Sequence, residues 1–145
     1  MTEALAAIGQ LIARYGPLAD AGDADGAARL WTDDGVYAVG GMEEARGHAA
    51  IAALLRGAEH QALLAAGCAH ILSPPAIELA AGGASASAVN HSIVLRRAED
   101  GTVTIYRVSA NRWSLVLTEA GWRIQRRDTR LLDGSAGARA LFASV

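Results

Sequence analysis

The 145 residues are enough for one domain with a core and an enclosed pocket, and the formal charge of −2 gives no electrostatic reason to expect nucleic acid as a partner. All thirteen basic residues are Arg, so a lysine Schiff base and a phosphate-loop lysine are both excluded. The single cysteine, Cys68, cannot form an internal disulfide or a thiolate metal cluster. We expect a cytoplasmic protein with no membrane association, since the first residues lack a basic leader and no apolar run approaches the roughly 18 residues that span a bilayer.

The first third of the chain is predicted to be mainly helical. Apolar residues recur at three- and four-residue steps from Leu5 to Tyr15, which is typical of an amphipathic helix, and Gly16-Pro17 interrupts that pattern. A short amphipathic turn follows at 25–31. Residues 33–35 have turn chemistry, and 36–39 reads as a strand.

A second strong helix is predicted over 48–66, and the pattern then changes to strands. Pro74-Pro75 interrupts the first of these segments, so it must lie at a sheet edge or a bulge. Three long strand-like segments follow, separated by Gly-containing hairpin turns: 84–97, 102–118 and 122–132. Helices followed by an antiparallel meander indicate an α+β fold, and we interpret 1–145 as one domain whose tail, 133–145, is partly flexible or docks on the rest.

Polar residues interrupt one face of the strand at 102–118. Strand alternation places Arg107, Ser109 and Asn111 on a face that is apolar at both ends. Two interpretations are open: these residues line a pocket, or they face solvent where the strand leaves the core. His91 shares a face with apolar neighbours and is either a pocket residue or a core histidine bonded to a backbone carbonyl.

Several local patterns, in this order, resemble the SnoaL-like branch of the nuclear-transport-factor-2-like superfamily. They are the helix end Tyr15-Gly-Pro-Leu-Ala-Asp20, the run Leu30 to Tyr37, the helix start Arg46 to Ile51, Ala69-His70, and the turn Gly121 to Ile124. The resemblance covers nearly the whole chain. It implies a cone-shaped, curved antiparallel sheet wrapped around N-terminal helices, with an interior pocket.

The resemblance also implies a candidate site. Scytalone dehydratase-like and hexachlorocyclohexane dehydrochlorinase-like members use a His–Asp pair, which Asp20 and His70 match. Asn111 matches the pocket asparagine of the dehydratases, and Tyr37 and Val39 fall where the family's first strand lines the pocket. The pair of tyrosines that the dehydratases use is not evident, since Ala19 precedes Asp20.

A histidine bonded to a carboxylate can take up and return a proton near neutral pH, with Arg107 or Asn111 stabilising a developing oxyanion. We therefore expect a cofactor-free lyase, of the dehydratase type, or an isomerase, acting on a small apolar or aromatic molecule. We expect no metal site, because His70 and Cys68 alone are two ligands. The alternative is a non-catalytic small-molecule-binding or assembly module. The fold also leads us to expect a homodimer or homotrimer.

Overall fold

The computed structural model describes residues 1–40 and 44–143. Its helices are α1 (Thr2–Ala13), α2 (Tyr15–Asp20), α3 (Ala24–Ala28), α4 (His48–Leu55), α5 (Ala58–Ala66) and α6 (Ala136–Ala140). Its strands are β1 (Trp31–Val39), β2 (Glu44–Arg46), β3 (Cys68–Leu72), β4 (Ala76–Leu79), β5 (Ser85–Arg97), β6 (Val103–Thr118) and β7 (Gly121–Leu131). Within these described ranges, no helix is long and apolar enough to cross a membrane.

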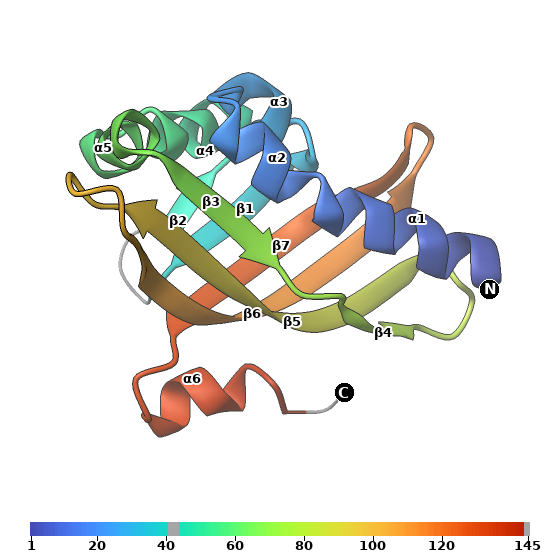
Figure 1. The fold of residues 1–145 in the computed structure, drawn as a ribbon. Helices are drawn as coiled ribbons and strands as arrows, with labels where there is room; N and C mark the ends of the chain where they lie inside the picture. Colours follow the sequence, from blue (N-terminus) through green and yellow to red (C-terminus); the bar gives the residue numbers. More distant parts are fainter. Residues whose placement is uncertain (41–43, 144–145) are drawn as a thin grey trace.

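The strands form one curved sheet in the order β2-β1-β7-β6-β5-β3, with β4 also paired to β5. Every pairing is antiparallel except that of β1 with β7, which is parallel. Helices α1 to α5 lie over one face of the sheet, and α6 lies against the other (Figure 1). The predicted α+β architecture, a curved sheet around N-terminal helices, is confirmed.

The core lies between the helices and the inner face of the sheet. The apolar stripe of α1 supplies Ile8 and Ile12, and the sheet supplies Trp31 and Trp113, all four at most 1% exposed. Burying each such side chain contributes on the order of 1.5–3 kcal/mol. This packing holds α1 across the strands and so fixes where α2 begins.

The prediction of one helix over 48–66 is wrong, because the helix breaks at Gly57. Gly57 has extended backbone (φ −66°, ψ 160°) and precedes the first turn of α5. The break lets α5 take its own direction, and Glu59, His60 and Leu63 of α5 line the pocket described below.

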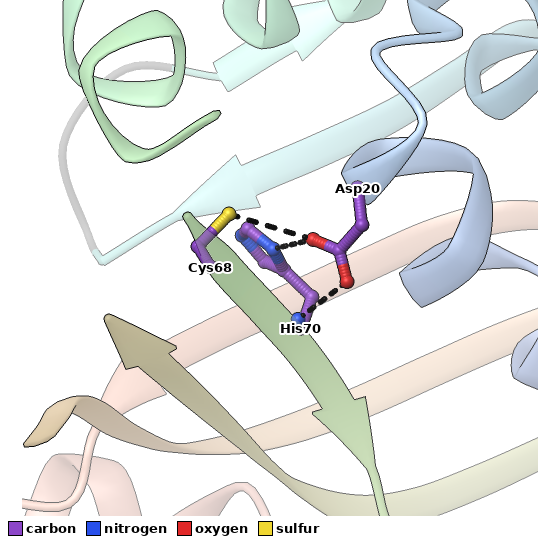
Figure 2. A group of neighbouring side chains, drawn as sticks. All are labelled: Asp20, Cys68 and His70. Carbon is purple, nitrogen blue, oxygen red and sulfur yellow. Dashed lines mark hydrogen bonds and ion pairs between the residues drawn. The ribbon is translucent and has the colours of Figure 1, made fainter. Parts of the chain in front are cut away.

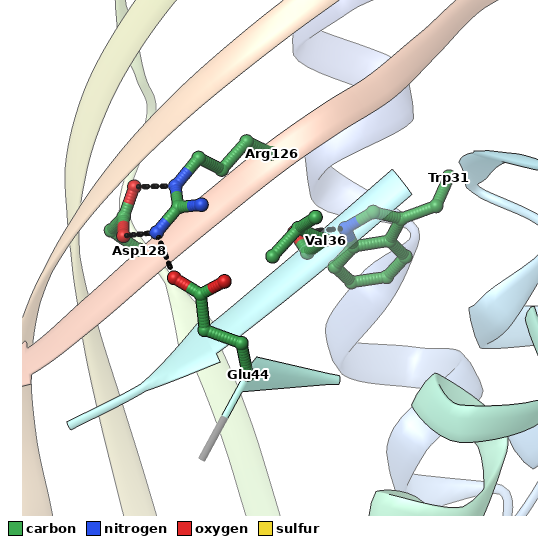
Figure 3. Close-up of polar contacts among 5 residues, drawn as sticks. All are labelled: Trp31, Val36, Glu44, Arg126 and Asp128. Carbon is green, nitrogen blue, oxygen red and sulfur yellow. Dashed lines mark hydrogen bonds and ion pairs between the residues drawn. The ribbon is translucent and has the colours of Figure 1, made fainter. Parts of the chain in front are cut away.

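The predicted turn at 33–35 is also wrong. These residues lie inside β1, where the pairing with β7 changes register between Trp31 and Val36. The indole N–H of Trp31 donates to the Val36 carbonyl across this irregular stretch at 3.1 Å (Figure 3). The turn-forming residues therefore make a bulge in a strand and leave Trp31 buried beneath it.

The tail contacts the outer face of the sheet. Arg112 of β6 donates to the carbonyls of Leu141 and Ala143 at 3.2 and 2.7 Å. The ring of Phe142 lies 4.9 Å from that of His91, centroid to centroid. In the described part of the tail, α6 and the residues that follow it thus cover β5 and β6 on the side away from α1 to α5.

Candidate active site

Gly16 positions the C-terminal end of α2 against β3. A Cβ atom at Gly16 would lie 2.2 Å from the main-chain oxygen of His70, which is closer than real atoms approach. The absence of a side chain is therefore what allows α2 to pack directly on the β3 backbone. Asp20 is the last residue of α2, and this close packing brings its carboxylate to His70.

Asp20 and His70 form a hydrogen-bonded pair (Figure 2). The distance from His70 Nδ1 to Asp20 Oδ1 is 2.7 Å, and the main-chain N–H of His70 donates to Asp20 Oδ2 at 2.8 Å. The Cys68 thiol donates to Oδ1 over 3.6 Å. A carboxylate only accepts hydrogen bonds, so the hydrogen lies on Nδ1 and Nε2 keeps a free lone pair.

Burial lowers the pKa of His70 below its ordinary value of 6.5. The hydrogen bond and charge of Asp20 oppose this shift, while the nearby His60 and Arg127 add to it. His70 is consequently neutral at pH 7 and available as a base. Burial, together with the charge of Asp20, raises the pKa of the Cys68 thiol to about 11, so Cys68 remains protonated.

His70 lines a pocket of about 140 Å³ between the helices and the sheet. This volume is similar to that of a cavity of roughly 150 Å³ that holds one benzene ring in another protein. Tyr37, Val39 and Arg107, three of the residues expected in the pocket, line it. The cavity is therefore ring-sized, with His70 in its wall.

The other two expected pocket residues lie elsewhere. Asn111 is fully buried behind the pocket wall, where its Oδ1 accepts two hydrogen bonds from Arg127. His91 is exposed on the outer face and packs against Phe142. Its neighbours Ser92 and Val94 line the pocket, because alternation along β5 turns those two side chains inward and His91 outward.

Arg127 lines the pocket. Strict alternation distributes the arginines of the strand segment 122–132 over both faces, which favours a solvated outer sheet or an oligomer contact for them. Arg127 is 3% exposed, and its guanidinium carbon lies 4.4, 4.8 and 4.5 Å from the ring centroids of Tyr15, Tyr37 and Trp113. Aromatic faces attract a cation electrostatically, which offsets part of the cost of burying this charge.

A β-bulge explains why simple alternation misplaces the arginines of β7. Ser114 pairs with Arg126, but the next residue of β6 pairs with Ile124, so Gln125 is left over. Ile124 and Arg127, three residues apart, consequently share the inner face. Arg126 turns outward and binds Asp128 and Glu44 through hydrogen bonds of 2.7–2.9 Å (Figure 3).

His60 is a second pocket residue that the sequence did not indicate. It is 8% exposed, and its Nε2–H donates to the Ala19 carbonyl at 3.0 Å. Its ring centroid lies 5.2 Å from that of His70. The single helix predicted over 48–66 gave no indication that His60 is buried, because the break at Gly57, after which α5 begins, is not part of that prediction.

The pocket continues into an outer recess of about 270 Å³ that includes Arg130 and Ser135. The two spaces share Glu59 and Arg107, which form an ion pair where they meet. The Tyr106 hydroxyl also donates to Glu59, at 3.1 Å. A molecule longer than one ring would thus extend past this ion pair toward the recess.

Asp20, Cys68 and His70 have possible metal-ligand atoms within 4.8 Å of one another. Their chemistry fits hydrogen bonding better than metal binding. Thiolate is the form of cysteine that binds metals, and the raised pKa of the Cys68 thiol means that a metal would first have to displace its proton. A metal on Asp20 and His70 Nδ1 would also replace the hydrogen bond that orients the imidazole.

The chain belongs to the family defined by the SnoaL-like domain, whose model matches residues 1–128. No curated protein matches this chain. This assignment agrees with the resemblance carried by the helix end at Asp20 and by Ala69-His70.

Solved structures place the fold within the NTF2-like group. An NTF2-like protein with a cystatin-like fold from Novosphingobium aromaticivorans is 54% identical, with a TM-score of 0.92 over 97% of this chain and 89% of that one. A Catenulispora acidiphila protein in complex with S-DNPA is 24% identical (TM-score 0.77; 90% and 95% covered). A N. aromaticivorans protein provisionally called a scytalone dehydratase is 19% identical (TM-score 0.73; 90% and 88% covered). The last two similarities show only that those proteins have the same fold as this chain.

Proposed function

We propose that this protein is a cofactor-free lyase or isomerase that moves a proton on a small, mostly apolar molecule. The observation that carries the proposal is the 2.7 Å contact between Asp20 and His70 at the wall of a ring-sized pocket. It leaves His70 Nε2 unprotonated, and an imidazole held in this way by a carboxylate is a general base.

In the proposed mechanism, His70 Nε2 takes a proton from a C–H or O–H group of the bound molecule. The imidazolium that forms is stabilised by Asp20, and the charge of Arg127 stabilises the negative charge left on the substrate. Loss of a leaving group would complete a lyase reaction. Return of the proton from His70 to another atom would complete an isomerisation.

His70→Ala is expected to lower general-base catalysis by at least about a hundredfold. A suitable probe is 5-nitrobenzisoxazole, whose ring C–H loses a proton to the base while its N–O bond breaks, giving a nitrile and a coloured phenolate. Initial rates of phenolate formation measure the effect. His91→Ala, which removes an exposed imidazole from the outer face, should keep the wild-type rate. Equal rates for His70→Ala and wild type would contradict the proposal.

The pH dependence of this reaction should follow His70. Because its pKa lies below 6.5, the unprotonated base is already dominant at neutral pH. The kcat/KM for the probe should therefore rise with pH on the acid side, with a midpoint below 6.5, and level off above that midpoint. A midpoint above the ordinary histidine value, measured on enzyme that stays folded across the range, would rule out this environment for the base.

The alternative function is binding without turnover. A neighbour of the same fold was crystallised with a small molecule, S-DNPA, which favours a ligand-holding role for the fold. A protein of this kind would bind small aromatic molecules yet show no rate difference between wild type and His70→Ala.

We also propose that the chain self-associates as a homodimer or homotrimer through its outer sheet face. Ile71 and Ile105 are 49% and 64% exposed there. Strand pairing places Ile71 beside Ile93 and Ile105 beside Leu95, so apolar side chains lie together at this end of the face, as in an interaction surface. Light scattering during size-exclusion chromatography tests this, and a monomer at micromolar concentration would contradict it.

A further inference from the structure

The pocket wall contains the guanidinium of Arg127, whose three nitrogens are unequally bonded within the described part of the chain. Arg127 Nε and Nη2 both donate to Asn111 Oδ1, at 3.0 and 2.8 Å. Nη1 is buried and has no partner among the residues that the structure describes. Two of the three nitrogens are therefore held in place by a neutral acceptor, and the third is unsatisfied.

Within residues 1–40 and 44–143, no acidic side chain forms an ion pair with Arg127. The arginines that form ion pairs across the described residues are Arg56, Arg107 and Arg126, and all three are far more exposed than Arg127. A buried charge without a paired opposite charge is costly, and the aromatic rings around Arg127 offset that cost only in part. Such a group is best satisfied by a ligand that brings the negative charge.

The chemistry around Arg127 indicates what kind of ligand this is. Tyr15 and Tyr37, whose rings contact the guanidinium, line the same pocket, as do the hydroxyl-bearing Ser109 and Thr129. The ring-sized volume and aromatic walls suit a planar apolar molecule. The guanidinium suits an anionic oxygen, which accepts charge-assisted hydrogen bonds.

We propose that the pocket binds a small ring molecule through an anionic oxygen, which pairs with the charged guanidinium of Arg127 in the pocket wall. The inference deepens the proposed function and rests on it for the location of the site. In the proton-transfer reaction, this oxygen is where the charge collects when His70 removes a proton from the ring system, as in an enolate or phenolate. Arg127 thereby selects substrates that become, or already are, oxyanions.

Binding of 4-nitrophenol tests this directly, because its absorption spectrum distinguishes phenol from phenolate. At a pH where both forms are present, wild-type protein should shift the spectrum toward phenolate. By calorimetry, the phenolate should bind about ten- to a hundredfold more tightly than nitrobenzene, a neutral analogue that lacks the phenolic oxygen. Benzoate, measured in parallel, distinguishes a site for any ring-borne anion from one suited to phenolate alone.

Arg127→Gln should abolish the spectral shift and weaken 4-nitrophenolate binding at least about tenfold, while leaving nitrobenzene binding nearly unchanged. Arg126→Gln is the matched control: it removes the same charge from the adjacent, outward-facing position and should leave both affinities as in wild type. Should Arg127→Gln fail to fold, Arg127→Lys keeps the charge without the planar fork and should weaken phenolate binding measurably.

Equal binding of 4-nitrophenolate and nitrobenzene by wild type would overturn the inference, as would an Arg127→Gln protein that binds phenolate normally. These measurements require no turnover. Selective binding of phenolate, together with equal rates for wild type and His70→Ala, would rule out the proposed catalysis and support the anion site. A large loss of rate in His70→Ala, together with equal binding of 4-nitrophenolate and nitrobenzene, would support the base and rule out the anion site.

Discussion

Asp20→Asn is expected to lower turnover of 5-nitrobenzisoxazole by about 10²–10⁴-fold, although the substitution changes the shape of the side chain very little. Asp20 Oδ1 now accepts a hydrogen bond from His70 Nδ1–H. An amide nitrogen in that place would donate instead, so the ring hydrogen would move to Nε2 and remove the basic lone pair. The imidazolium would also lose the charge that stabilises it.

Asp25→Asn provides the control for this prediction. Asp25 is an exposed acid in α3 that pairs with Arg56 at 2.8 Å, away from the pocket, so its neutralisation should leave the rate unchanged. Both proteins should melt close to wild type. A fully active Asp20→Asn enzyme would mean that His70 acts without help from Asp20, or does not act as the base.

Trp113→Ala is expected to reduce the free energy of unfolding by about 3–5 kcal/mol. Trp113 is fully buried in the centre of β6, so the substitution leaves a large cavity beneath the helices. Its indole N–H donates to Asn90 Oδ1 at 2.9 Å, and that buried oxygen would lose its donor. The Arg127 guanidinium would also lose one of its three aromatic contacts.

Urea unfolding followed by circular dichroism measures this loss. Leu117→Ala is the matched control on the same strand: Leu117 is 48% exposed, and its truncation should change stability by no more than roughly 0.5 kcal/mol. A loss below about 1 kcal/mol for Trp113→Ala would show that the core repacks around the site.

The sequence was sufficient to predict the fold because the same pattern, a long strand followed by a turn, recurs over the second half of the chain. Three strands of eleven or more residues, with Gly turns between them, leave little choice but an antiparallel meander. The parallel pairing of β1 with β7 joins segments about ninety residues apart, and no local pattern specifies it. Asp20 and His70 were found through the resemblance, since an acid at a helix end and a histidine in a strand have no distinctive periodicity.

The residues whose faces the sequence predicted wrongly lie next to a β-bulge or a register shift in a strand. Arg127 follows the bulge at Gln125, which exchanges the two faces of β7. Ile105 precedes a similar register shift in the pairing of β5 with β6. It is therefore exposed, although strict alternation along β6 would place it on the same face as Arg107. One extra residue in a strand inverts every later assignment, and sequence alone does not show where it is.

Gly16 has a consequence for how this pocket can change in evolution or by design. The separation of Asp20 from His70 depends on main-chain contact between Gly16 of α2 and His70 of β3, and of the side chains that shape the cavity only Leu72 lies close to that contact. Wall residues such as Val39 or Leu63 can therefore be exchanged to suit molecules of other shapes while the proton-transfer pair keeps its spacing. Specificity and chemistry are separately adjustable in this scaffold, and Gly16 is the position at which variation should be tolerated least.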